Sequence, residues 1–274
     1  MALTPIRIAW RLQRWRERSV PCVGRERELE IVREHVRTRR PVLVTGATGS
    51  GKSTILRALY GCWTPEGADL EPLYAEESRT QRSLMRHLLV NLLLSRGRLG
   101  CGSNDARRSI VSLVELSRFV TNAGLDDLMQ VLHQNLPRDG VVLALDHLDP
   151  AHPKVATMIE AWLERVPVVL AARRPEGLGR VRWLFPSHAH LELAPLDSRS
   201  IHTVIGMIAA ELRLPMRDVD VNEVTRLAAG SPGRLCLLMR TAANQRYWKD
   251  VGVQWRLVAL DVRIHEIGQR DGPE

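Results

Sequence analysis

A glycine-rich segment between two apolar stretches constrains this chain more than any other feature. Residues 46–53 read Gly-Ala-Thr-Gly-Ser-Gly-Lys-Ser, which matches the pattern G-x-x-x-x-G-K-[ST]. The preceding run Pro41–Thr45 predicts a short buried strand, and the following run Ser53–Leu59 predicts a helix. Glycines let successive backbone N–H groups converge on one anion, and the start of the helix adds positive potential. The sequence therefore predicts a phosphate-binding loop between a strand and a helix.

The chain is poor in lysine, yet one of its lysines lies in this loop. It has 39 basic residues, of which only Lys52, Lys154 and Lys249 are lysines. Lys52 is expected to reach the β- and γ-phosphates as a compact charge that arginine would not replace, and the Ser53 hydroxyl is expected to bind Mg²⁺. We therefore expect ATP and Mg²⁺ as cofactors, with the phosphates surrounded by Gly46, Ala47, Thr48, Gly49, Ser50, Gly51, Lys52, Ser53 and Thr54.

The strongest strand pattern, Val141–Leu145, ends at an acidic residue. Asp146 is thereby placed to reach the magnesium from the end of a neighbouring strand. Hydrolysing proteins with this pair of motifs usually carry a glutamate next, whereas here His147 follows, with Asp149 two residues later. Either Asp149 or His147 orients the attacking water, or hydrolysis is slow and the protein works as a nucleotide-dependent switch. Asp149, which precedes Pro150, could alternatively serve only to cap the next helix.

Strands and helices alternate along the first two thirds of the chain. Continuous apolar strands such as Val141–Leu145 and Val166–Ala172, separated by helical patterns, predict a parallel sheet covered on both faces. Beyond Pro195 we find no strand pattern, only three short helical ones at Arg199–Leu212, Val221–Ala229 and Arg234–Ala243. The expected fold is a three-layer αβα domain followed by a small all-helical lid. The expected domains are a basic arm at 1–20, the αβα domain at 21–195, the lid at 196–246, and a C-terminal helix and tail at 247–274.

Composition excludes some classes of protein. The longest apolar stretch, Val166–Ala172, is far shorter than the roughly 20 residues that span a bilayer, so we expect no membrane segment. The four cysteines show no metal-ligand spacing and are too sparse for a disulfide framework, which favours reduced thiols and a cytoplasmic location. The N-terminal arm carries Trp10 and Trp15 among arginines, and we expect a surface helix or an arm that contacts a partner; its arginines are Arg7, Arg11, Arg14, Arg16 and Arg18.

Three further segments indicate which class of phosphate-loop protein the chain resembles. Val23–Leu29 resembles the hVGRExEL segment of AAA+ and STAND ATPases, Val168–Arg173 resembles their sensor 1 strand, and Gly230–Leu235 is similar to the sensor 2 motif of initiator-type AAA+ proteins. The chain is thus identified as similar to AAA+/STAND P-loop ATPases, with archaeal origin-recognition and transposition-regulator ATPases as the nearest shapes. The resemblance implies that an adenine lies against Val23, Gly24 and Arg25, and that Arg234 reaches the γ-phosphate from the lid. Gly233 lengthens the sensor 2 motif by one residue.

ATPases of this kind often complete their site with an arginine from a neighbouring subunit. The candidates follow the sensor 1 strand and are Arg173, Arg174, Arg180 and Arg182. The same cluster could instead form a solvated basic loop or a surface that faces DNA. The residues expected to act directly in hydrolysis are Lys52, Asp146, Asp149, His147, Arg173 and Arg234.

The formal net charge of +8 favours an acidic partner. We expect a slow or conditional ATPase that forms homo-oligomers with ATP and binds DNA through phosphate contacts without reading its sequence. Such a switch would load or regulate another machine, of the helicase or transposase type, as its protein client. The alternative hypothesis is a STAND-like signalling or scaffold ATPase, in which the nucleotide gates contact with a protein partner.

Overall fold

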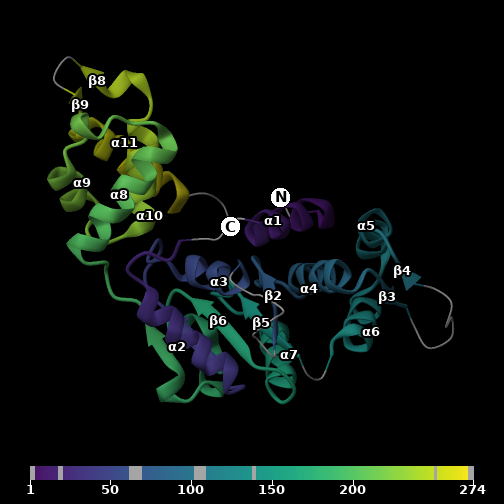
Figure 1. Cartoon of the computed structure of the whole chain (residues 1–274). Coiled ribbons are helices and arrows are strands. Elements are labelled where there is room, and N and C mark those ends of the chain that lie inside the picture. Colours follow the sequence, from purple (N-terminus) through teal and green to yellow (C-terminus); the bar gives the residue numbers. More distant parts are fainter. Residues whose placement is uncertain are drawn as a thin grey trace. The chain divides into compact units, whose positions relative to one another are not determined.

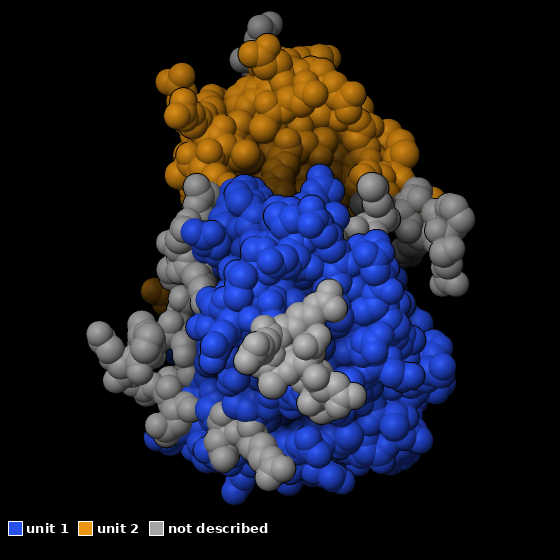
Figure 2. Space-filling model, turned by 90° about the vertical axis from the view of Figure 1, so that its right-hand side faces the viewer, with its two compact units in different colours: residues 1–46, 52–192 blue, residues 47–51, 193–274 orange. Residues whose placement is uncertain are grey.

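The chain divides into two compact units. The computed structural model describes residues 4–17, 21–61, 70–101, 109–137, 140–249 and 252–270. Contacts between Cα atoms place residues 1–46 and 52–192 in the first unit, and residues 47–51 and 193–274 in the second (Figure 2). The tip of the glycine-rich loop therefore belongs to the second unit, although the residues on either side of it belong to the first.

The first unit is built on a five-stranded parallel sheet in the order β2-β5-β6-β1-β7, of which β2, β5 and β6 are labelled in Figure 1. All residues of the three central strands are buried, as expected for a parallel sheet with helices on both faces. This confirms the predicted three-layer αβα architecture. The strands are β1 (Val42–Thr45), β2 (Glu71–Ala75), β5 (Val141–Leu145), β6 (Val168–Ala172) and β7 (His190–Glu192).

The strand β6 begins two residues later than the apolar pattern predicts. The Val166 N–H bonds to the carbonyl oxygen of Trp162 in the turn after the preceding helix. Pro167 has no N–H to donate to a neighbouring strand. Pro167 can take part in the ladder only through its carbonyl oxygen, which accepts a bond from the Leu143 N–H at 3.0 Å, and the strand itself begins at Val168.

The described residues of this unit form seven α-helices. They are α1 (Pro5–Glu17), α2 (Glu26–Arg37), α3 (Lys52–Gly61), α4 (Gln81–Arg96), α5 (Leu113–Asn122), α6 (Leu125–Asn135) and α7 (Pro153–Leu163). The helix α3 packs against β2 and β6, and α4 packs against β2. Between α4 and α5 the chain forms a short antiparallel pair of strands, β3 (Leu99–Gly100) and β4 (Ser109–Ile110). After β6 come two 3₁₀ segments, η1 (Pro175–Leu184) and η2 (Ser187–Ala189).

The edge strand β2 is completed by a side chain of α4. Asn91 accepts a hydrogen bond from the Tyr74 N–H at 3.2 Å and donates one to the Tyr74 carbonyl oxygen at 2.9 Å. A buried edge strand would otherwise leave these two backbone groups unpaired. Asn91 thus substitutes for a missing neighbouring strand and fixes the position of Tyr74.

The predicted N-terminal arm is a packed helix. In α1 the side chains of Ile8, Ala9 and Leu12 are buried, and the helix packs against α3, α4 and α5. Its apolar residues share one face at helical spacing, which explains why it folds onto the unit and does not extend from it. Residues 5–17, expected to be a surface helix or an arm, thus form a helix that packs within the first unit. The side chain of Arg16 and the whole of Arg18 lie outside the described residues.

The second unit has its own helical core. It contains α8 (Ser198–Leu212), η3 (Met216–Asp218), α9 (Val221–Ala228), α10 (Pro232–Ala242), η4 (Gln245–Tyr247), the pair β8 (Trp248–Lys249) and β9 (Gly252–Val253), and α11 (Trp255–Arg270). The helix α11 packs against α9 and α10, and its buried face shares their apolar core. The predicted tail at 247–274 is therefore part of the lid's core over its described residues. The strand pair β8–β9 corrects the expectation of no strands beyond Pro195.

The second unit begins just before α8. Its first residue after the sheet is Leu193, and the Leu196 N–H bonds to the Gly230 carbonyl oxygen at 2.8 Å. The side chain of Leu196 is buried in the apolar core of this unit. This pairing with Gly230 fixes the start of the lid just before α8.

Candidate functional site

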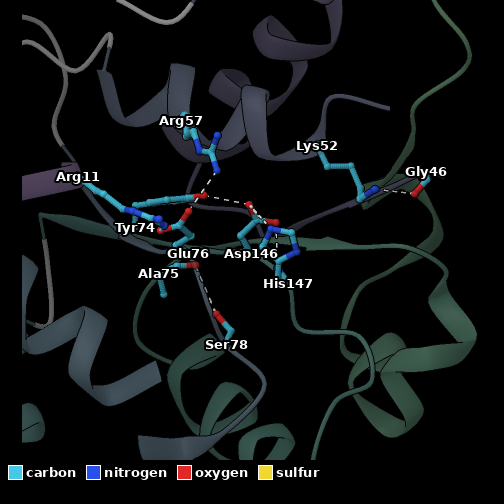
Figure 3. Close-up of polar contacts among 10 residues, drawn as sticks. All are labelled: Arg11, Gly46, Lys52, Arg57, Tyr74, Ala75, Glu76, Ser78, Asp146 and His147. Carbon is cyan, nitrogen blue, oxygen red and sulfur yellow. Dashed lines mark hydrogen bonds and ion pairs between the residues drawn. The ribbon is translucent and has the colours of Figure 1, made fainter. Parts of the chain in front are cut away.

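The glycine-rich loop adopts the backbone conformations that its glycines allow. Gly46, Gly49 and Gly51 have φ angles of 149°, 80° and 102°, which L side chains rarely adopt. The loop leads from β1 directly into α3, which begins at Lys52. The Lys52 Nζ donates a hydrogen bond to the Gly46 carbonyl oxygen at 2.7 Å (Figure 3). The ammonium group thus folds back toward the start of the loop, where phosphates would bind.

Four charged side chains surround the start of α3. Burial lowers the pKa of Lys52 below its ordinary value, Asp146 and Asp149 oppose that shift, and Arg173 adds to it. The charges of Asp146, Asp149 and Arg173 thus all act on Lys52. The site therefore combines two cations with two carboxylates, which is the composition that binding a phosphate–metal pair requires.

The carboxylate of Asp146 is buried and held by two donors. The Tyr74 hydroxyl donates to its Oδ2 at 2.9 Å, and the His147 N–H donates to its Oδ1 at 2.9 Å (Figure 3). Burial, together with the nearby Asp146 charge, raises the pKa of Tyr74 well above its usual range, so the phenol stays protonated and remains a donor. Asp146 also continues the parallel pairing of β5 with β2, since its N–H bonds to the Ala75 carbonyl oxygen.

The two residues expected to orient water lie in different surroundings. His147 has a φ of 50°, and its side chain is 54% exposed with Nε2 3.8 Å from the Asp146 Oδ2. A non-glycine residue in this conformation is strained, and such residues cluster at functional sites. Asp149 is half-buried and lies against Gly177, so close that a Cβ on that glycine would be 1.8 Å from Oδ1. The N-cap of α7 is His152, so Asp149 does not cap that helix.

The donors at this site suit magnesium. Asp146 offers a carboxylate at the end of β5, and Ser53 offers a hydroxyl in the first turn of α3. Mg²⁺ prefers oxygen ligands and is usually held by one or two protein groups while phosphates and water complete its coordination. Within the described residues no group of three or more His, Cys, Asp or Glu side chains could hold a metal on its own. The residues present therefore fit a metal that arrives with a nucleotide.

The segment expected to contact adenine forms the turn before α2. Gly24 has a φ of 68°, and its N–H bonds to the Glu26 carboxylate at 3.0 Å. The Arg25 side chain is buried and pairs with Glu28 at 2.8 Å. Val23, Gly24 and Arg25 are thus held at the entry to α2, and their contact with adenine stays a prediction.

The arginines after β6 separate into different roles. The Arg173 carbonyl oxygen accepts a hydrogen bond from the Gly46 N–H, and its side chain influences Lys52 in the same chain, so it lies beside its own loop. Arg180 pairs with Glu160 of α7. The Arg182 guanidinium stacks at 4.1 Å on the ring of Trp183, a side chain that is 75% exposed and that the sequence analysis missed. Arg174 is exposed at the start of η1.

In the second unit the loop tip packs against the start of α10. The Gly233 N–H donates to the Gly49 carbonyl oxygen at 2.9 Å, and the Ser231 hydroxyl donates to the same oxygen at 3.3 Å. The extra glycine of the sensor 2 motif therefore allows close contact between two backbones. The Arg234 side chain lies 3.9 Å from Glu266 of α11, and its contact with a γ-phosphate stays a prediction.

Sequence reasoning missed a polar network beside Asp146. The arginines Arg11 and Arg57 both pair with Glu76, the residue that follows β2. Parallel register would have placed this residue, because Ala75 lies opposite Leu145 and the next pair is Glu76 and Asp146. The signal was hidden because the weak pattern Leu73–Ala75 gives no indication that β2 is the strand next to β5.

Comparison with known proteins agrees with this fold. A family model described as "AAA ATPase domain" matches residues 21–173. No curated protein matches the sequence. None of the described helices is both long enough and apolar enough to cross a membrane.

Several solved structures resemble the chain. The Aeropyrum pernix ORC1 protein, solved in complex with DNA, matches with a TM-score of 0.56 at 18% identity, over 92% of this chain and 68% of that one. Cdc6p from Pyrobaculum aerophilum matches with a TM-score of 0.55 at 14% identity, over 82% and 62%. Domain III of the Thermotoga maritima replication initiation protein DnaA matches with a TM-score of 0.55 at 14% identity, over 89% and 93%. At these identities the likeness is one of fold.

Proposed function

This chain belongs to the AAA ATPase domain family, and from that premise we propose that it binds ATP and acts as a nucleotide-dependent switch. The observation that carries the proposal is the glycine-rich loop between β1 and α3, with Gly46, Gly49 and Gly51 at positive φ and the Lys52 Nζ folded back onto the Gly46 carbonyl oxygen. Hydrolysis is slow or conditional, since the residue after Asp146 is a histidine.

Each residue of the site has a defined task in this proposal. Backbone N–H groups of residues 46–51 bind the phosphates, and Lys52 exchanges its bond with the neutral Gly46 carbonyl for a charged phosphate oxygen. Ser53 and Asp146 hold Mg²⁺, which offsets the charge that develops on the β- and γ-phosphates. Arg173, whose charge acts on Lys52, adds a second positive charge at the site.

We expect fewer side chains to orient the attacking water than in fast ATPases of this class. Asp149 is the better placed of the two candidates, because its charge acts on Lys52 and its carboxylate is confined against Gly177. His147 is exposed and donates only its backbone N–H to Asp146. A water held by Asp149 alone would react slowly until a further group, such as an arginine from a second copy, completes the site.

The charge of the chain supports DNA as the partner. The formal net charge is +8, and arginines on the described surface include Arg174 and Arg182, the latter stacked on Trp183. A basic surface attracts the phosphates of duplex DNA whatever its sequence, and exposed aromatic rings can stack on bases. We propose that ATP promotes homo-oligomers on DNA, which load or regulate a client of the helicase or transposase type.

One experiment tests this proposal against its alternative. ATP binding, ATPase rate and particle size are measured with and without duplex DNA for the native chain, for Lys52→Ala and for Lys154→Ala. Lys154 is an exposed lysine on α7, so it controls for the loss of one positive charge. We expect only Lys52→Ala to lose nucleotide binding and ATP-dependent assembly. Equal nucleotide affinity in all three proteins would refute the site.

The salt dependence of binding tests whether DNA is the partner. Affinity for duplex DNA is expected to fall steeply with salt, because released counterions drive the contact. Nucleotide binding without any DNA binding would favour the alternative, a STAND-like ATPase whose nucleotide state gates a protein partner. The altered sequence after Asp146 and the ending Ala172-Arg173 of β6 are the features that favour this alternative.

A further inference from the structure

Tyr74 connects the metal-binding carboxylate to the helical layer of the first unit. Its hydroxyl donates to the Asp146 Oδ2 at 2.9 Å from a fully buried ring (Figure 3). A phenol has one proton to donate, and here that proton is directed at Asp146. The backbone of Tyr74 is fixed in turn by Asn91, which pairs with both its N–H and its carbonyl oxygen.

A cation polarises this phenol from the other side. The charge of Arg57 on α3 acts on the Tyr74 phenol, and its guanidinium lies 3.4 Å from the Glu76 Oε1. A cation beside a hydroxyl makes that hydroxyl a stronger donor to its own acceptor. The bond from Tyr74 to Asp146 is therefore reinforced by Arg57.

The helix α1 contributes two side chains to this network. The Trp15 ring meets Tyr74 edge-on with centroids 5.2 Å apart, and the Arg57 guanidinium lies 4.7 Å above the same indole. Arg11, one turn earlier, pairs with Glu76 at 2.7 Å (Figure 3). All of α1 precedes residues 21–173, the segment that the family model covers. Arg11 and Trp15, which lie outside that segment, thus contact Glu76 and Tyr74 beside Asp146.

We propose that Tyr74 is a positioning residue for the metal ligand Asp146, and that α1 keeps Tyr74 and Arg57 in place. This inference rests on the Mg²⁺–nucleotide site of the proposed function. Its consequence is specific: the network sets the affinity for Mg²⁺ and leaves the phosphate contacts of the glycine-rich loop unchanged. A partner that binds or displaces α1 would then alter the metal requirement without touching the nucleotide.

Tyr74→Phe isolates the hydroxyl. It keeps the ring, its contact with Trp15 and the backbone bonds to Asn91, but it removes one of the two donors to Asp146. Loss of a group that orients a metal ligand typically weakens metal binding by about 10- to 100-fold. We expect a shift of this size in the Mg²⁺ concentration that half-maximally stabilises the complex with a non-hydrolysable ATP analogue. Affinity for the analogue without Mg²⁺ should stay the same.

Two matched controls accompany this variant. Tyr247→Phe removes a hydroxyl that pairs with Asp261 in the second unit, and Trp10→Ala removes an indole that is 61% exposed on α1. Both should keep the native Mg²⁺ requirement. Arg11→Ala and Trp15→Ala should shift it in the same direction as Tyr74→Phe but by a smaller factor.

The readout is the thermal unfolding midpoint of each protein, measured against Mg²⁺ at saturating analogue. A native Mg²⁺ requirement in folded Tyr74→Phe would overturn the proposal. If Tyr74→Phe does not fold, Arg11→Ala and Trp15→Ala provide the test instead. A native Mg²⁺ requirement in both of these variants would also overturn the proposal. A native chain that binds no nucleotide would contradict the proposed function instead, so the two failures are distinguishable.

Discussion

Gly233→Ala tests the contact between the loop tip and the start of α10. An added Cβ at this position would lie 2.6 Å from the Gly49 Cα and 3.2 Å from its carbonyl oxygen. Both of these are backbone atoms, so no flexible side chain can move aside. To reach an ordinary contact of 3.4 Å, the two segments must separate by about 0.8 Å.

That separation would lower the stability of the protein by breaking a hydrogen bond. It would stretch the 2.9 Å bond from the Gly233 N–H to the Gly49 carbonyl oxygen beyond hydrogen-bond length. The net loss is about 0.5–1.5 kcal/mol for the bond, and overpacking of a tight contact typically costs about 1–3 kcal/mol in all. Because Gly49 lies within the phosphate loop, we expect the affinity for ATP to fall as well, by roughly tenfold for each 1.4 kcal/mol.

The assay compares Gly233→Ala with Gly206→Ala in α8, where an added Cβ would meet nothing within 4 Å. Chemical denaturation and ATP-analogue titration are measured on both variants and on the native chain. Gly206→Ala should leave ATP affinity unchanged and gain about 0.5–1 kcal/mol of stability from the helix preference of alanine. If Gly233→Ala matched Gly206→Ala in both measurements, the inferred close contact would be wrong.

Three further predictions follow from buried and confined groups. Asn91→Leu should lower the free energy of unfolding by about 2–4 kcal/mol in urea denaturation, because both backbone groups of Tyr74 lose their partner; a loss below 1 kcal/mol would contradict this. Burial lowers the pKa of His87, with Glu76 and Glu77 opposing and Arg86 adding to the shift. The unfolded chain therefore gains a proton first on acidification, and stability should fall below about pH 6.5 by at most about 1.4 kcal/mol per pH unit. His87→Gln should remove that part of the slope, and an unchanged pH profile would refute it. Gly177→Ala should displace Asp149 and lower kcat while KM for ATP stays constant, as steady-state kinetics would measure; an unchanged kcat would exclude Asp149 from orienting water.

The sequence was most informative where local chemistry dictates structure. The strand Val141–Leu145 was predicted with its observed bounds, because five apolar residues between a glycine turn and an aspartate leave few alternatives. The loop at 46–53 was located because its glycines are needed at positive φ whatever surrounds them. The αβα sheet followed from the alternation of such segments.

Contacts between distant segments could not be predicted in this way. No pattern within residues 1–20 indicates that Trp15 meets Tyr74, since both are aromatic residues in weakly patterned surroundings. Asn91 is likewise an ordinary polar residue in a leucine-rich helix until the sheet order makes β2 an edge strand. Strand order is a tertiary property, and it determines which polar residues become partners.

The roles of individual arginines could likewise not be predicted from the sequence. The excess of arginine suggested a surface for DNA, yet several arginines are used inside the first unit as multiple donors. Arg82 donates to the carbonyl oxygens of Val120 and Ala123 at the end of α5, and Arg57 donates to Glu76 while its guanidinium lies over the Trp15 ring. Guanidinium groups suit this task because their five N–H groups reach several acceptors at once.

Arginines that bind inside the protein release no counterions from DNA. The salt dependence of DNA binding should therefore report only arginines that are not held by bonds to the protein, such as the exposed Arg174 and the partly exposed Arg182, and its slope should be well below the value that the whole arginine content implies. Arg174→Gln and Arg182→Gln should each reduce that slope by about one, whereas Arg82→Gln should lower stability and leave it unchanged. A slope that responds equally to all three substitutions would mean that the internal arginines are accessible to DNA, against the hydrogen bonds that hold Arg82 to α5.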